Sequence, residues 1–226
     1  RLFGEWAGLA NSISAKAHLL LATGFLTEAV TRFELALKLA LELQDDDLAA
    51  SIHSFLGWTI ASQGDTYSEK ARLYLALGHF RQWRKLACQA CHSQEADSTS
   101  VAASELCIAH MHLRLAGVKR EKVPDTQPDN NRCEDDPESN AIHYHVGEAQ
   151  RHYFRYLNWT EAVEDTRGVS HAHMCLARVY EAIGDTEGTY RNKNTSLEDL
   201  RRLGDVKNQG MIRAQEHEEM VRSMLQ

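Results

Sequence analysis

The chain has 226 residues, of which 43% are apolar, and its 25 basic and 32 acidic residues give a net charge of −7. This composition excludes collagen-like and low-complexity chains, and the length allows a sizeable buried core. Only three prolines occur, where average usage would give about eleven. We therefore expect a mostly helical protein.

The sequence contains no segment typical of a membrane span. Its best apolar run, 17–26, includes a histidine and is shorter than the ~18 apolar residues that a span requires. The five cysteines form no disulfide framework, which favours a reducing compartment. We expect a soluble cytoplasmic protein, with a nuclear location as the alternative. Because the chain starts at Arg1 without a signal peptide, we interpret it as a fragment of something longer.

Helical periodicity is strongest from Ser14 to Leu43, on both sides of Gly24, and predicts two antiparallel helices joined at that glycine. Similar turn signals recur along the chain, at Gly64-Asp65, Gly78-His79, Gly117-Val118, Leu157-Asn158 and Gly184-Asp185. Three of the intervals between them are about 40 residues long, as in helical repeat proteins. We predict an all-α fold, an α-solenoid of about five or six antiparallel helix hairpins.

Two of the intervals between predicted turns are too short for a hairpin, namely 64–78 and 157–184. A solenoid that omits a helix exposes the apolar faces of the neighbouring helices. The hypothesis that follows is that the chain joins ordered segments across missing ones, near Asp65 to Tyr67 and near Asp165 to Val169.

All three prolines lie between Val118 and Asn140, in a stretch that is rich in Asp, Glu and Asn. Such a stretch does not pack as a helix, and it predicts an acidic loop or insertion over 118–140. The loop separates the predicted repeats of 1–117 from those of 141–226. It is either a disordered insertion or a regulatory, partner-binding loop, and the sequence leaves both interpretations open.

Small and large apolar residues alternate along the predicted hairpins in a recurring pattern, with Ala29, Phe33 and Ala36 after the first turn, and Leu56-Gly57 and Leu176 to Tyr180 before later ones. This pattern resembles the tetratricopeptide repeat superfamily, and the long unit resembles its ~40-residue subclass, to which spindle-orientation adaptors and rapsyn-like scaffolds belong. The resemblance implies a non-catalytic adaptor or scaffold for protein–protein interaction. Self-association is a further expectation, because uncapped end repeats often associate.

In such arrays the first helix of each hairpin lines a concave groove. Counting the same offset before each predicted turn places arginine there repeatedly, with aromatic residues and a methionine between the arginines. The predicted partner-binding residues are Trp58, Arg72, Met111, Arg114, Tyr144, Arg151, Phe154, Arg155 and Arg178. Guanidinium groups grip carboxylates bidentately and aromatic residues supply apolar contact area, so we predict an acidic extended or helical segment as the partner. Another protein ligand and a purely structural surface remain open.

The alternative is a metal- or haem-binding helical protein. Cys88, Cys91 and His92 match the C-x-x-C-H sequence that attaches haem, and Cys107 with His110 would supplement a zinc site. The same segment is also explained as a packing helix of a repeat, in which a free cysteine acts as a small hydrophobe. The paired histidines 110/112, 143/145 and 171/173 lie two residues apart in helical stretches and cannot share one ion. We therefore predict no cofactor and no metal.

Two other classes of function are disfavoured. The acidic balance, with a pI of about 5.9, speaks against a phosphate-binding footprint for nucleic acid. No nucleophile elbow, phosphate-binding glycine loop or H-E-x-x-H motif occurs in the sequence. We do not expect an enzyme.

Overall fold

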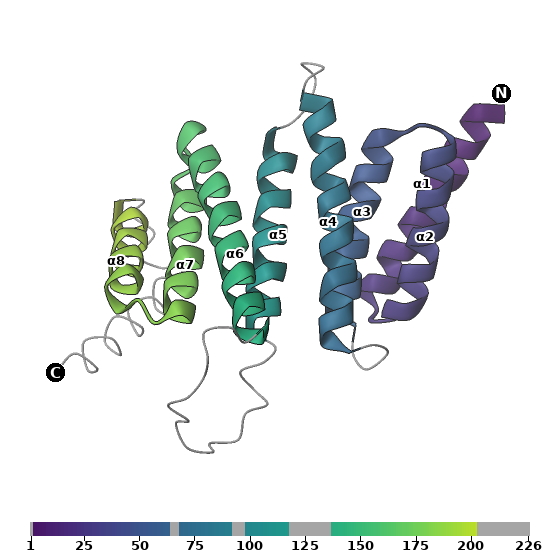
Figure 1. Cartoon of the computed structure of the whole chain (residues 1–226). Coiled ribbons are helices and arrows are strands. Elements are labelled where there is room, and N and C mark those ends of the chain that lie inside the picture. Colours follow the sequence, from purple (N-terminus) through teal and green to yellow (C-terminus); the bar gives the residue numbers. More distant parts are fainter. Residues whose placement is uncertain (1, 64–67, 92–97, 118–136, 203–226) are drawn as a thin grey trace. The chain divides into compact units, whose positions relative to one another are not determined.

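The computed structural model describes residues 2–63, 68–91, 98–117 and 137–202. These residues form helices and no strand, which confirms the all-α prediction (Figure 1). The helices are α1 (Leu2–Ala22), α2 (Leu26–Glu42), α3 (Asp46–Ser62), α4 (Glu69–Cys91), α5 (Ser98–Gly117), α6 (Pro137–Ala162), α7 (Thr166–Ile183) and α8 (Thr186–Arg202). The chain divides into two compact units, residues 1–127 and 128–226.

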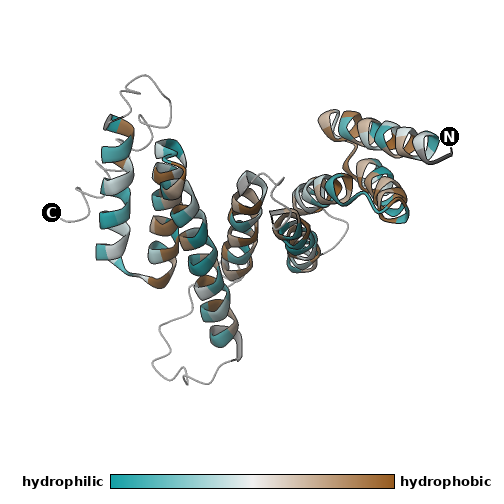
Figure 2. Ribbon diagram, turned by 90° about the horizontal axis from the view of Figure 1, so that it is seen from above, coloured by the Kyte–Doolittle hydropathy of each residue, from teal (hydrophilic) through white to brown (hydrophobic). Residues whose placement is uncertain are grey.

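In unit 1, the helices α1 to α5 pack as consecutive antiparallel neighbours: α1 on α2, α2 on α3, α3 on α4 and α4 on α5. Apolar residues form stripes along the helices, with hydrophilic residues on their other sides (Figure 2). The stripes meet in one core, whose largest fully buried side chains include Phe33, Ile52, Leu56, Leu73, Leu77, Phe80 and Ile108. This stacking of helix hairpins is the arrangement of an α-solenoid.

In unit 2, α7 packs against α6 on one side and α8 on the other. The buried apolar residues of unit 2 come from all three helices and include Val146, Ala149, Tyr153, Leu176, Val179 and Leu197. Polar residues join α7 to α8: the hydroxyl groups of Ser170 and Ser196 lie 2.8 Å apart, and both residues are buried. A small residue, Gly188, allows the ring of Tyr180 to approach α8 closely.

Four of the tight turns share one geometry. Gly24, Gln44, Glu164 and Gly184 each have a positive φ, between 56° and 84°. In each turn the next amide donates a hydrogen bond of 2.8 to 3.0 Å to the carbonyl oxygen five residues earlier, as in a Schellman motif. The turns at Gly24 and Gly184 confirm the sequence prediction. The turns at Gln44 and Glu164 lack the glycine that usually marks this conformation.

Two predicted turns are wrong. Gly78 lies inside α4 and Leu157 lies inside α6, so both helices continue through the expected breaks. The turn after α6 comes instead at Glu164, and the chain around Asp165 continues without interruption into α7. The two short intervals therefore arise from misplaced turns, and they give no reason to infer missing helices. Residues 64–67, the other expected junction, lie outside the described residues.

The predicted loop over 118–140 ends earlier than expected, because α6 begins at Pro137. Proline suits the first position of a helix, where its missing N–H would have no helical partner. Residues 118–136 lie outside the described ones. None of the helices in the described part of the chain combines the length and the apolar character needed to cross a bilayer.

Candidate functional site

The first helices of unit 1, α1, α3 and α5, contact one another through side chains. The ring of His18 on α1 lies 4.1 Å from that of Phe55 on α3, edge to face. The Trp58 indole on α3 donates a hydrogen bond to the sulfur of Cys107 on α5. Trp58 keeps 42% of its surface exposed. This residue of the predicted groove therefore lies on a first helix and remains accessible.

Arg114, also on a first helix, already has partners within unit 1. Its Nη1 atom donates a hydrogen bond of 3.3 Å to the carbonyl oxygen of Ala61, in the last turn of α3. Its Nη2 atom pairs with Glu69 at the start of α4, at 3.1 Å. A cation at a helix C-terminus satisfies carbonyl oxygens that the helix leaves unpaired. The position of Arg114 is thus explained by capping α3 and joining it to α4.

Two predicted groove residues do not lie in an exposed row on the first helices. Met111 is 1% exposed and belongs to the core of unit 1, so it offers no surface to a partner. Arg72 is half-buried and lies on α4, a second helix, because the turn from which its position was counted does not exist. The register counted from Gly78 is therefore wrong for this part of the groove.

Four predicted residues do come together, on one side of α6. Tyr144, Arg151, Phe154 and Arg155 are all exposed, and their spacing places them on the same side of the helix. We call these four residues the α6 surface. The turn at Leu157, from which their groove positions were counted, does not exist, because α6 runs through that residue.

The opposite side of α6 packs against α7. Tyr153 lies near enough to Cys175 to lower the pKa of that thiol, although burial is the larger effect and raises it, and the ring of Tyr156 lies 6.1 Å from the ring of His171. Thr160 approaches Gly168 so closely that a Cβ atom there would lie 2.5 Å from the threonine methyl group. These contacts fix the rotation of α6 in unit 2. The α6 surface is consequently held outward by packing on the far side of the helix.

Arg178, the last predicted residue, lies exposed on α7. It is close enough to His171 to lower the pKa of that imidazole, after burial, which is the larger cause. Since α7 packs on the side of α6 opposite to the α6 surface, Arg178 is not a member of that surface. The structure thus separates the predicted groove residues into several places on the two units.

The residues of the metal or haem alternative are only partly described. Cys88 is half-buried on α4, whereas the side chains of Cys91 and His92 lie outside the described residues. Cys107 is buried, and burial raises the pKa of its thiol to about 12. Nothing in this geometry favours the alternative over a packing role.

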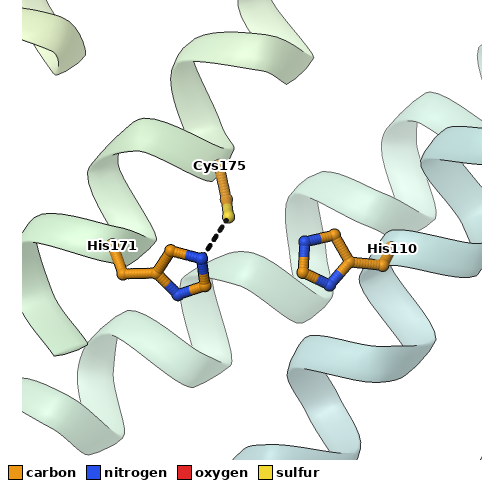
Figure 3. A group of neighbouring side chains, drawn as sticks. All are labelled: His110, His171 and Cys175. Atoms are coloured by element: carbon orange, nitrogen blue, oxygen red, sulfur yellow. Dashed lines mark hydrogen bonds between the residues drawn. The ribbon is translucent and has the colours of Figure 1, made fainter. Parts of the chain in front are cut away.

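The two histidines of the 171/173 pair have different neighbours. His173 Nδ1 lies 3.0 Å from the Oδ1 atom of Asn192 on α8. His171 points elsewhere: its Nε2 atom lies 3.6 Å from Cys175 Sγ, one turn along α7 (Figure 3). The residue Cys175 is 2% exposed, and this burial raises the pKa of its thiol to about 11. This contact lies within α7, between residues four apart in the chain.

Comparisons with known proteins found no matching family model and no matching curated protein. The chain has similarity to the crystal structure of BtubC from P. vanneervenii, with 20% identity over 90% of this chain and 84% of that chain and a TM-score of 0.41. It also has similarity to the de novo designed helical repeat protein DHR64, with 15% identity over 98% of this chain and 99% of that chain and a TM-score of 0.41. The fold assignment given above comes from the helices and their packing.

Proposed function

We propose that the chain is a non-catalytic interaction module of the tetratricopeptide type, which binds an acidic segment of a partner protein at the α6 surface. The observation that carries the proposal is that two arginines and two aromatic residues share one exposed side of α6. Guanidinium groups bind carboxylates in a bidentate manner, and aromatic rings supply the apolar area that dominates many protein interfaces. An acidic segment with an apolar anchor satisfies both kinds of group.

Arg151 of the α6 surface is accessible to such a partner. The Arg151 side chain is 73% exposed and pairs with Glu148 one turn away. The guanidinium is solvated although Glu148 is only 19% exposed, so the free Arg151 N–H groups can bind a carboxylate from a partner while the pair with Glu148 remains. Part of the binding free energy then comes from charge attraction, and affinity falls as salt concentration rises.

The proposed role is that of an adaptor or scaffold in the cytoplasm or nucleus. Support for a reducing compartment comes from the three described cysteines, all of which are free thiols. Stacked helix hairpins suit such a role because they present helix sides over a long surface and need no flexible parts to do so.

Peptide binding tests this proposal. The probe is the synthetic peptide Asp-Phe-Glu-Asp-Leu-Glu, titrated into the isotopically labelled full chain while amide NMR signals are followed. We expect the signals of α6 residues 144–155 to shift. The double charge reversal R151E/R155E should weaken the binding at these signals about tenfold or more, equivalent to about 1.4 kcal/mol for each factor of ten.

The matched control is R32E/K38E, which reverses two exposed charges on α2. This variant changes the net charge by the same amount, so it reports the effect of overall charge on binding of the probe. A variant without a charge change, Y144A/F154A, tests the apolar contribution. Unchanged affinity at the α6 signals in R151E/R155E, with native circular dichroism, would remove the proposal.

A further inference from the structure

The exposed side of α4 carries a second group of aromatic, apolar and basic residues. Tyr74 and Leu75 are 45% and 51% exposed, and Arg81 and Lys85 are exposed about two to three turns further along the helix. The spacing of these four residues places them on the same side of α4. We call them the α4 surface. Gly78 lies among them, and a Cβ atom added there would meet no atom within 4 Å, so the surface is open at its middle.

The charged residues of α4 are nearly all basic. The helix contains five basic residues and one acidic residue, Glu69, in a chain whose net charge is −7. Glu69 pairs with Arg114, and Arg84 pairs with Glu105, so both of these α4 groups are held by α5. Within α4, no acidic residue lies within two turns of Arg81 or Lys85. The α4 surface is therefore cationic as well as partly apolar.

The α4 surface repeats the spacing of the α6 surface. Tyr74, Arg81 and Lys85 occupy positions i, i+7 and i+11 of one helix, and Tyr144, Arg151 and Arg155 occupy the same positions of another. Both sets are exposed, and both lie on helices that run through the turns predicted from the sequence. The two units thus carry the same pattern of one tyrosine and two cations.

We infer that the α4 surface is a second binding site for an acidic segment with an apolar anchor, so that each unit of the chain holds one such segment. This inference rests on the proposed function, because it assigns the same ligand chemistry to a second helix. Charge complementarity selects the ligand: an acidic segment neutralises Arg81 and Lys85, and its apolar residue covers Tyr74 and Leu75.

The size of the surface sets the length of the ligand. Tyr74 and Lys85 are eleven residues apart, about 16 Å along a helix with a rise of 1.5 Å per residue. An extended peptide rises about 3.3 Å per residue, so about five residues cover that distance. The short probe peptide used for α6 therefore fits α4 as well.

Arg81 is held in place before a ligand arrives. Its Nη2 atom lies 3.4 Å from Nε2 of His112, a buried residue of α5. A guanidinium group that is already oriented loses less conformational freedom when it binds a carboxylate. The remaining N–H groups of an exposed arginine can then point toward the ligand.

The experiment uses the full chain and the same peptide, Asp-Phe-Glu-Asp-Leu-Glu, with NMR signals of α4 and α6 read separately. We expect signals of residues 74–85 to shift in the native protein. R81E/K85E should weaken binding at these signals about tenfold and leave binding at the α6 signals within twofold of native. R151E/R155E should weaken binding at the α6 signals and leave binding at the α4 signals within twofold of native. The control R32E/K38E should leave binding at both helices within twofold of native.

The outcomes separate this inference from the proposed function. If α6 signals respond as proposed and α4 signals do not shift, or shift equally in R81E/K85E, the second site is overturned while the function stands. If neither helix responds, both are overturned. The variants Y74A and L75S, which keep the charge, should each weaken binding at α4, and unchanged binding in both would overturn the apolar part of the site. Tighter binding of single-stranded RNA than of the peptide at α4 would overturn the acidic-segment assignment.

Discussion

The Nδ1 atoms of His53 and His79 lie 2.9 Å apart and join α3 to α4 in unit 1. One Nδ1 atom must donate a proton and the other must accept it, so at least the accepting ring is neutral and the contact is lost when both rings are protonated. Burial, followed by the nearby His79, lowers the pKa of His53 to about 4, and burial also lowers the pKa of His79. The pair is a contact that acid should break.

Stability of unit 1 should therefore depend on pH. Because the folded protein keeps His53 neutral down to about pH 4 and the unfolded chain binds a proton near pH 6.5, acid favours unfolding. The contribution of His53 is fully present above pH 6.5 and is lost as the pH falls from there to about 4, with a loss of about 1–3 kcal/mol. Urea unfolding followed by tryptophan fluorescence at several pH values measures it.

The variant that tests this dependence is His53→Gln. Its control is His143→Gln, which replaces an exposed histidine of α6. The first variant should lose the part of the pH dependence that comes from His53, and the second should keep it. Equal pH profiles for the native protein and His53→Gln would contradict the assignment, since the carboxylates that also titrate in acid are the same in both.

Gly78→Ala tests whether α4 continues through the predicted turn. In a helix with open space around the Cβ position, alanine is better than glycine by about 0.8–1.0 kcal/mol, so the variant should be more stable. Gly57→Ala is the matched control in α3, where the new Cβ would lie 2.6 Å from the Phe80 ring; we expect it to destabilise by about 1–3 kcal/mol. A loss of stability in Gly78→Ala, measured by thermal unfolding, would favour a turn at that residue.

Glu164→Gly should stabilise unit 2, because Glu164 has a φ of 56°, a conformation that costs non-glycine residues about 1–2 kcal/mol. Part of that gain is offset by the greater freedom of glycine in the unfolded chain, which leaves about 0.5–1 kcal/mol. Glu161→Gly, inside α6, should instead lose about 1 kcal/mol. Chemical denaturation of the two variants side by side gives the comparison, and equal losses in both would contradict the turn geometry.

Arg84→Met should destabilise unit 1 by leaving Glu105 without its ion-pair partner on α4. The Glu105 side chain is 5% exposed and that of Arg84 is 37% exposed, so solvent replaces only part of the lost interaction. We expect a loss of about 2 kcal/mol, below the 3–5 kcal/mol of a fully buried pair. The double variant Arg84→Met/Glu105→Leu should recover much of this loss. No recovery in urea unfolding would show that the pair itself does not determine the effect.

Which residues lie together on α6 could be predicted from local spacing, whereas the groove could not. Tyr144, Arg151 and Arg155 lie within one helix, and the 3.6-residue period alone places them on one side. Predicting the groove required the correct position of the turn in every hairpin. The turn expected at Gly78 does not exist, and the groove position of Arg72 was counted from it. Because of the same error, α4 was predicted as two helices, so the shared side of Tyr74, Arg81 and Lys85 was not recognised. A count of basic residues over 69–91 would have shown that this segment is basic.

The sequence by itself determined the helical fold, the turns at Gly24 and Gly184 and the spacing of residues along each helix. These properties depend on local backbone preferences, which a few residues set. Only the tertiary structure decided that Gln44 and Glu164 form turns, that Gly78 stays helical and that Met111 is buried. The preference of one residue is worth about 1 kcal/mol, and the burial of whole helix faces against neighbouring helices outweighs it.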